Sequence, residues 1–213
     1  MRGFYRKTTE SGPIVAGAKV YLGEGVPECI LMDEILHADG RDVSSHIVFC
    51  FKGHGHLDTV LKLISEKSNE MAGLFLLLDA EQHGFARRCA IVARAVTDAR
   101  IFSRPVKSAP GVQVIGGKRL DFFVSPNNRN RGRIEDVIIN ELRNYPEWLD
   151  IDSWAQTLVD HGYLANKDAK ALVQFYISIK TPGMCGAAAG FESGRLNFTD
   201  AAYQDIRAAV LAL

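Results

Sequence analysis

The sequence has no long apolar run, no paired cysteines and no excess of charge of either sign. None of its apolar runs approaches the roughly 18 residues that span a membrane. No apolar segment of signal-peptide length follows the basic amino terminus, so neither an anchor nor an export signal is expected. The four cysteines stand apart, without a Cys-x-x-Cys motif. This argues against a zinc ribbon or a redox pair and predicts free, buried thiols in a cytoplasmic protein.

The charge balance limits the classes of partner. The chain carries 25 Lys and Arg against 25 Asp and Glu, which gives a formal net charge of zero. A protein that coats nucleic acid over its whole surface is therefore not expected, although a local basic patch remains open. With 213 residues, of which 47% are hydrophobic, the chain is long enough to form a core without a disulfide or metal staple.

The order of apolar segments predicts an α/β fold. Short apolar runs alternate with amphipathic stretches of helical spacing, a pattern typical of a mainly parallel sheet flanked by helices. The predicted strands are 18–22, 46–51, 73–78, 112–115 and 120–124, and the predicted helices are 27–37, 57–67, 85–97 and 134–142. We predict a flexible lead-in over residues 1–16, an α/β domain over 17–146 and a helical extension packed on it over 147–213. The extension has candidate helices at 151–162, 166–179 and 200–213, with a Gly/Ala/Pro-rich connector at 181–190.

Acidic residues follow three of the predicted strands. Glu24 comes after the first strand, Asp79 and Glu81 after the third, and Glu135 beyond a later one. Ligands of an open parallel sheet bind beyond the carboxyl ends of its strands, so these carboxylates are expected at one edge. Asp79 and Glu81 are two residues apart and would point to one side of an extended chain. Such oxygen ligands suit Mg²⁺ or Mn²⁺, while the alternative is that the acids simply cap helices.

Three of these acids stand in two motifs that resemble the Toprim fold, the metal-dependent domain of topoisomerases, primases and some nucleases. That family has a Glu followed by Gly after its first strand, and an Asp-x-Asp after a later apolar strand. Residues 22–25 read Leu-Gly-Glu-Gly and residues 76–81 read Leu-Leu-Leu-Asp-Ala-Glu. The resemblance implies a Toprim-like (Rossmann-like) sheet, with Glu24 as general acid/base. It also implies that Asp79 and Glu81 hold a metal and that Glu135 supports it.

The chain is more closely similar to one Toprim-like family of bacterial and archaeal proteins, a domain of unknown function. The similarity covers nearly all of residues 18–213 and depends on the order and spacing of several short motifs. They read Phe-Val-Ser-Pro-Asn-Asn at 123–128, Gly-Arg-Ile-Glu-Asp at 132–136, Lys-Ala at 170–171, Pro-Gly at 182–183 and Ala-Gly-Phe at 189–191. Two positions depart from the family pattern: Glu81 replaces an Asp, and Glu28 stands where an Asp often follows the first Glu by four positions. Both departures keep a carboxylate, but on a side chain that is one methylene longer. The longer side chain is expected to hold an ion less firmly.

Basic residues near the predicted site are candidates for phosphate contacts. Arg129 and Arg131, with Arg133, form a basic segment together with Lys118 and Arg119, and Lys52 follows the second strand. A phosphate clamp at Lys52, Arg129 and Arg131 is one interpretation, and a solvated loop is the other. His54 and His56 form a His-x-His pair for which a solvated loop is the favoured interpretation.

The resulting hypothesis is Mg²⁺-dependent (or Mn²⁺-dependent) phosphoryl transfer or hydrolysis on nucleic acid or a nucleotide, as in a nuclease-like enzyme. A second hypothesis is a non-catalytic module that binds a metal or phosphate ligand and acts through partners. The Glu81 departure and the neutral charge favour that alternative. A purely structural protein is the third, and clustered carboxylates argue against it because like charges repel unless something neutralises them.

Overall fold

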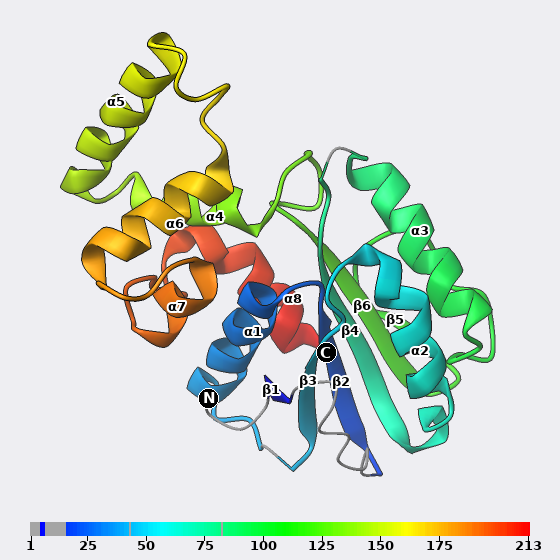
Figure 1. Ribbon diagram of the computed structural model, residues 1–213. Coiled ribbons are helices and arrows are strands. Elements are labelled where there is room, and N and C mark those ends of the chain that lie inside the picture. Colours follow the sequence, from blue (N-terminus) through cyan, green and yellow to red (C-terminus); the bar gives the residue numbers. More distant parts are fainter. Residues whose placement is uncertain (1–4, 7–15, 43, 82) are drawn as a thin grey trace.

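The computed structural model describes residues 5–6, 16–42, 44–81 and 83–213. Its centre is one six-stranded sheet with the strand order β1-β3-β2-β4-β6-β5 (Figure 1). The strands are parallel except β5, which pairs antiparallel with β6. Their bounds are β1 Tyr5–Arg6, β2 Ala18–Gly23, β3 His46–Cys50, β4 Met71–Asp79, β5 Gln113–Ile115 and β6 Lys118–Ser125. The predicted α/β class with a mainly parallel sheet is confirmed.

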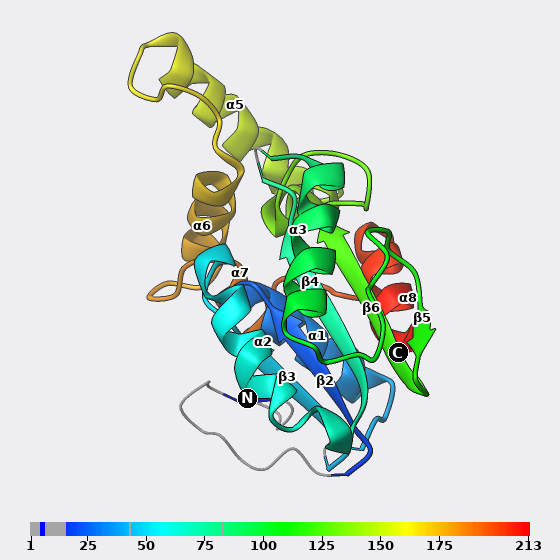
Figure 2. The same ribbon diagram turned by 90° about the vertical axis from the view of Figure 1, so that its right-hand side faces the viewer.

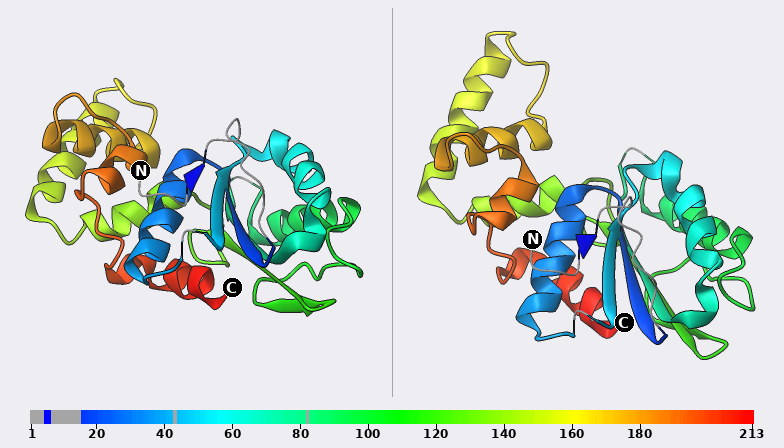
Figure 3. Two further views of the ribbon diagram at one scale, coloured as in Figure 1. Left: turned by 90° about the horizontal axis from the view of Figure 1, so that it is seen from below. Right: turned by 60° about the horizontal axis from the view of Figure 1, so that its bottom comes forward.

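Helices cover both faces of the sheet (Figures 1 and 2). Helices α2 and α3 lie on one face, α1 and α8 lie on the other, and α4–α7 extend the second layer into a lobe beside α1 (Figure 3). Helix α5 projects farthest from the sheet (Figure 1). The bounds are α1 Val26–Ala38, α2 Leu57–Ser65, α3 Phe85–Asp98, α4 Ile134–Leu142, α5 Pro146–Asp160, α6 Ala169–Lys180, α7 Ala187–Glu192 and α8 Gln204–Ala212, with single 3₁₀ turns at His54–His56, Ser68–Glu70 and Ala201–Tyr203.

The central strand β4 shows why both faces need helices. Successive side chains of a strand point to opposite faces, and nearly all of β4 is buried. Phe75 and Leu77 belong to the core under α1 and the carboxyl-terminal helices, whereas Leu74, Leu76 and Leu78 belong to the core under α2 and α3. An unbroken apolar run of this kind is the signature of a strand covered on both sides.

Several expectations for the flanking segments need correction. Within the predicted lead-in, Tyr5–Arg6 form β1 against β3, and residues 1–4 and 7–15 lie outside the described residues. The connector expected at 181–190 contains the start of α7, and the helix expected from residue 151 begins at Pro146. The thiols of Cys29, Cys50 and Cys89 are free and buried as expected, but Cys185 is exposed.

None of the helices in the described ranges is both long enough and apolar enough to cross a membrane.

The strand order creates a crevice at the carboxyl edge of the sheet. Strands β2 and β4 are neighbours, yet α1 leaves β2 over one face and α3 leaves β4 over the other. Chains that depart in opposite directions from adjacent parallel strands leave an opening between them, which is the usual ligand position in open α/β sheets. Glu24 and Asp79 flank this opening because each stands at the end of one of the two strands.

Candidate functional site

A cavity of about 490 Å³ lies at this edge and gathers five carboxylates. Four of the predicted acids line it, together with Glu28 and the predicted phosphate contact Lys52. Helices α6 and α7 form its outer wall and contribute Lys170. Its acidic and basic lining residues are Glu24, Glu28, Asp79, Glu81, Glu135, Lys52 and Lys170. The structure thus brings together the acids that follow separate strands, as the topology of a parallel sheet leads one to expect.

Glu24 is held in place by its backbone and by its carboxylate. Its N–H donates to the carbonyl of Leu77 at 3.1 Å and its carbonyl accepts from the N–H of Gly53 at 2.8 Å. Its Oε2 atom accepts a hydrogen bond from the Asp79 N–H at 3.1 Å and forms a buried ion pair with Arg88 on α3. Donors of two kinds therefore set the direction of the Glu24 carboxylate.

Asp79 ends β4 and faces the start of α4. Its Oδ1 atom accepts from the N–H of Ile134 at 2.9 Å, one of the amides that a helix leaves unpaired at its first turn. Burial raises the pKa of Asp79 well above its usual value, and the negative charges of Glu28, Glu135 and Glu24 raise it further. Asp79 thus lies among other carboxylates, whose negative charge disfavours its ionised form.

Glu135, in the first turn of α4, approaches the same cavity from the other side. Its side chain is buried, and this burial raises the pKa of Glu135 while the positive charges of Lys170 and Arg133 oppose the rise. Electrostatic attraction thus links Glu135, in the first turn of α4, to Lys170 on α6.

Glu28, which the sequence singled out only as a departure from the family pattern, also lines the cavity. It stands in the first turn of α1, is 3% exposed, and accepts a hydrogen bond from the Gly25 N–H at 2.9 Å. Burial raises the pKa of Glu28 to about 8, with the charges of Glu135 and Glu24 adding to the effect. The signal that could have found it is its position: the first turn of a helix that leaves β2 directly after Glu24.

Glu81 reaches the cavity by a different route from the one expected. The extended geometry predicted for residues 79–81 is wrong, because Glu81 has a left-handed backbone with φ of 48°. Its N–H donates to the carbonyl of Gly132 at 2.8 Å, which ties the loop after β4 to the loop after β6. Glu81 still lines the cavity, but a turn and not a shared strand face brings it there.

The chemistry of the donor set fits a hard divalent cation. Five carboxylates face two lysines across the cavity, and three of the acids have raised pKa values. The hydroxyl of Ser125, which pairs with Asp79 in the β4–β6 register, is buried without a hydrogen-bond partner in the part of the chain that the structure describes. Carboxylate oxygens are the ligands that Mg²⁺ or Mn²⁺ prefers, whereas Ser125 does not itself line the cavity.

The donors are nevertheless not preassembled around a single point. Among residues 5–6, 16–42, 44–81 and 83–213, no group of three or more His, Cys, Asp or Glu side chains is arranged to hold a metal ion. The hydrogen bonds above explain this, because Glu28, Asp79 and Glu24 each turn toward a backbone N–H. An ion would have to draw the carboxylates away from these amides.

The predicted basic segment is divided. Lys52 lines the acidic cavity, whereas Arg129 and Arg131 line two other hollows. Lys118 and Arg119 do not belong near the site at all. They stand at the start of β6, opposite the carboxyl edge, where Lys118 donates to the carbonyl of Ser68 and Arg119 donates to the carbonyl oxygen of Leu213. The prediction that Lys118 and Arg119 lie near the site was wrong, because the two ends of a strand lie at opposite edges of the sheet.

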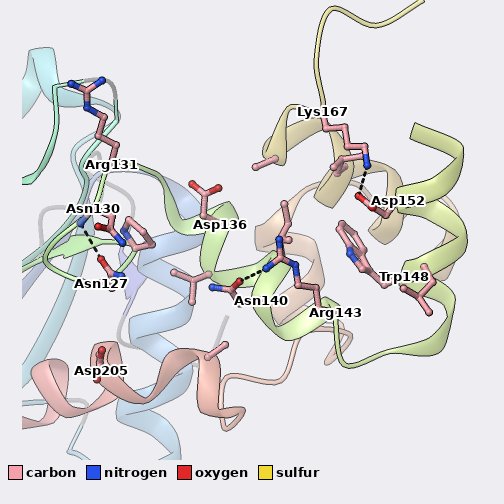
Figure 4. A pocket seen from close by; sticks show the side chains of 17 residues that line it. Asn127, Asn130, Arg131, Asp136, Asn140, Arg143, Trp148, Asp152, Lys167 and Asp205 are labelled. Atoms are coloured by element: carbon pink, nitrogen blue, oxygen red, sulfur yellow. Dashed lines mark hydrogen bonds and ion pairs between the residues drawn. The ribbon is translucent and has the colours of Figure 1, made fainter. Parts of the chain in front are cut away.

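The larger cavity, of about 710 Å³, lies beyond the first turn of α4 (Figure 4). Two of its acids are engaged in structural contacts, since Asp136 accepts from the Arg133 N–H at 2.7 Å and Asp152 pairs with Lys167 at 3.0 Å, and the third, Asp205, is exposed. Arg131 points away from Asn140 and the centre of the cavity (Figure 4). We place the candidate site in the smaller cavity, because the four predicted acids converge there and three of its carboxylates have raised pKa values.

Two cysteines lie beneath the acids. Cys50, which lines the cavity, has its pKa lowered to about 7 because the Cys29 side chain hydrogen-bonds its thiolate. Burial raises the pKa of Cys29.

Of the predicted His-x-His pair, His56 is exposed and the side chain of His54 lies outside the described residues. The interpretation of this segment as a solvated loop stays a prediction.

We expect that only glycine at position 23 allows the first turn of α1 to pack this closely against the end of β2. A Cβ atom there would lie 2.5 Å from Cys29 Sγ, 3.0 Å from the Cys29 backbone N and 3.1 Å from Glu28 Cβ. Gly23→Ala should therefore displace α1 and lower the free energy of unfolding by about 2 kcal/mol, measured by urea denaturation. Gly55→Ala is the control because its Cβ would meet nothing within 4 Å. Equal midpoints for the two variants would contradict the close approach.

Comparisons with protein-family models, with curated proteins and with solved structures find no match for this chain. The Toprim resemblance stated from the motifs therefore stays a prediction, and the fold is described by its α/β class alone. What the chain does has to be argued from the geometry of the acidic cavity.

Proposed function

We propose that the chain catalyses Mg²⁺-dependent (or Mn²⁺-dependent) phosphoryl transfer or hydrolysis on nucleic acid or a nucleotide. The observation that supports this most is the group of buried carboxylates with raised pKa values at the topological switch point, facing two lysines. Carboxylates whose pKa values are raised by burial and by one another cluster at functional sites, where a bound cation can take the place of the protons.

Each residue has a proposed part. Asp79, Glu81 and Glu135 would hold the ion, with Glu28 added to the predicted set because it lines the same cavity. Glu24 is oriented by Arg88 and the Asp79 N–H, and it would act on a proton as general acid or base. Lys52 and Lys170, both exposed at the rim, would bind substrate phosphate. When bound, the metal would stabilise negative charge on the phosphoryl group and orient water.

Metal titration tests the proposal first. We expect saturable calorimetric binding of Mg²⁺ and Mn²⁺ to the wild-type protein, and binding about 100-fold weaker or lost in Asp79→Asn, which removes a ligand charge. Asp58→Asn, an exposed aspartate on α2, is the matched control. Cleavage of a labelled strand in Mn²⁺, compared with Glu24→Gln, then tests catalysis. Absence of binding at millimolar metal would contradict the assignment of the ion.

One observation favours the non-catalytic alternative. The carboxylates of the described residues are not arranged to hold an ion without moving, and loosely held ligands support binding better than catalysis. On this alternative the cavity binds a metal or a phosphate ligand and the chain acts through partners. Metal binding that is lost in Asp79→Asn, without any cleavage that depends on Glu24, would favour the module over the enzyme.

A further inference from the structure

Cys29 and Cys50 are free, buried thiols that belong to the same core, on the α1 face of the sheet. Cys50 ends β3, and its partner in the parallel register is Gly23 at the end of β2. Register partners on neighbouring strands point to the same face and lie about 5 Å apart. The Cys29 Sγ atom lies only 2.5 Å from the place that a Cβ atom of residue 23 would occupy. Because Gly23 has no side chain, the thiol of α1 can lie beside that of Cys50.

The two thiols interact directly and differ in acidity. The Cys29 side chain hydrogen-bonds the Cys50 sulfur, and this bond, together with the N–H and the charge of Lys52, lowers the pKa of Cys50 to about 7. Burial raises the pKa of Cys29 well above its usual value. Cys50 is therefore the thiol that ionises near neutral pH and can act as a nucleophile, while Cys29 keeps its proton.

Only one of the two thiols borders the acidic cavity. Cys50 lines it together with Lys52 and Lys170, whose side chains are exposed at the rim, whereas Cys29 is not among the lining residues. A small, uncharged oxidant such as hydrogen peroxide can therefore approach the Cys50 sulfur through the cavity. Cys29 lies behind it, in the place of a second thiol that attacks once the first has been oxidised.

We propose that Cys50 is a site of oxidation by hydrogen peroxide and that Cys29 is its resolving thiol, so that the pair closes a disulfide beneath the acidic cavity. The Cys50 thiolate attacks one peroxide oxygen: an S–O bond forms, the O–O bond breaks, and the departing hydroxide takes up the proton that Cys50 had released. The sulfur loses two electrons to the peroxide and becomes a sulfenic acid. Cys29 then attacks this sulfur, an S–S bond forms, the S–O bond breaks, and the Cys29 proton leaves with the hydroxide as water. Two thiols and one peroxide give one disulfide and two waters.

The disulfide would tie the first turn of α1 to the end of β3, and both segments support acids of the cavity. Glu28 stands in that turn, and the Cys50 thiol donates to the Glu24 carbonyl at 3.9 Å. Oxidation therefore alters the surroundings of two carboxylates. Any effect of oxidation on metal-dependent activity rests on the proposed function, but the oxidation itself does not.

Mass spectrometry of the whole protein in hydrogen peroxide, without metal, tests the proposal. Cys185→Ser removes the exposed thiol and is the starting protein. It should lose the mass of two hydrogen atoms, peptide mapping without reduction should join Cys29 to Cys50, and dithiothreitol should reverse the change. Adding Cys29→Ala should stop the reaction at a sulfenic acid that dimedone traps on Cys50. Cys89→Ala, which removes the buried thiol of α3, is the matched control and should leave the disulfide unchanged.

The starting protein keeps both thiols, so the central result does not depend on the folding of the Cys29 variant. In that protein, peroxide should oxidise Cys50 at least about tenfold faster than Cys89, whose pKa burial raises to about 11. Unfolding in urea should remove the difference, because it separates Cys50 from Cys29. Equal rates in the folded protein, a disulfide that joins other cysteines, or no reaction at a peroxide concentration that oxidises free glutathione would overturn the proposal. Since no metal enters this assay, its failure would leave the proposed Mg²⁺-dependent activity untouched.

Discussion

The metal-free protein is expected to lose about 3 to 5 kcal/mol of its free energy of unfolding as the pH rises from about 5 to about 8. Glu28 has a pKa near 4.5 when unfolded and about 8 in the folded chain, and burial also raises the pKa values of Asp79 and Glu135. In this window the folded state binds more protons than the unfolded state, so each step upward in pH favours unfolding. The stabilising contribution is complete below about pH 4.5 and lost once the pH passes about 8.

Urea denaturation at a series of pH values in a chelator measures this slope. Glu28→Gln should flatten it, because a neutral amide keeps a hydrogen-bond acceptor for the Gly25 N–H and does not ionise. Glu66→Gln, at an exposed position after α2, should leave the slope unchanged. Because the three acids titrate as a cluster, the midpoint belongs to the group and not to Glu28 alone. A flat or rising profile in the unsubstituted protein would show that the acids are already compensated.

The sheet could be predicted to a large extent from the sequence. Buried parallel strands are continuous apolar runs, and the helices between them have amphipathic spacing, so β2, β3, β4 and β6 were found with small errors at their ends. The order β3-β2-β4-β6 could not be predicted from periodicity. Alternation shows which side chains are buried, but it does not show which strand becomes the neighbour of which.

The carboxyl-terminal helices were harder to predict because their ends depend on tertiary contacts. Helix α7 lies in a Gly/Ala-rich stretch that has the composition of a connector. A Cβ atom at Gly190 would lie 2.7 Å from Leu196 and 2.8 Å from Ile177, so the small residue serves a close approach of α7 to its neighbours. Local propensity contains no information about such a contact.

The gathering of acids at one cavity could be predicted where strand topology decides it, but not where helix faces decide it. Glu24, Asp79 and Glu135 followed from the rule that ligands gather beyond the carboxyl ends of strands. Arg88 did not, although its signal was present: it is a charged residue at a position that helical spacing assigns to the buried face of α3. A charge on an apolar face deserves a search for a buried partner before it is counted as a solvated side chain.

Glu141 on α4 is a second buried carboxylate whose removal should have a large effect, and it accepts hydrogen bonds from two tyrosine hydroxyls and a backbone N–H. It is 0% exposed. Its Oε1 atom accepts from the Tyr145 hydroxyl at 3.0 Å and the Asn197 N–H at 2.7 Å, and its Oε2 atom accepts from the Tyr203 hydroxyl at 2.7 Å. Burial raises the pKa of Tyr203 far above its usual value, with the Glu141 charge adding to the effect. Glu141 thus joins α4 to the segments that lead into α8.

Glu141→Ala is therefore expected to lower the free energy of unfolding by about 3 kcal/mol, since it leaves three donors, of which the Tyr203 hydroxyl is buried, without an acceptor and opens a cavity. Glu141→Gln should cost less, because its amide oxygen still accepts a hydrogen bond. Asn140→Ala, at the exposed neighbouring position, is the control. Hydrogen exchange should show faster opening of residues 197–213 in Glu141→Ala than in the control, because these residues lose their hydrogen-bonded link to α4. A loss in Glu141→Ala no larger than in Asn140→Ala would mean that water satisfies the donors, and that the link through Glu141 does not hold α8 in place.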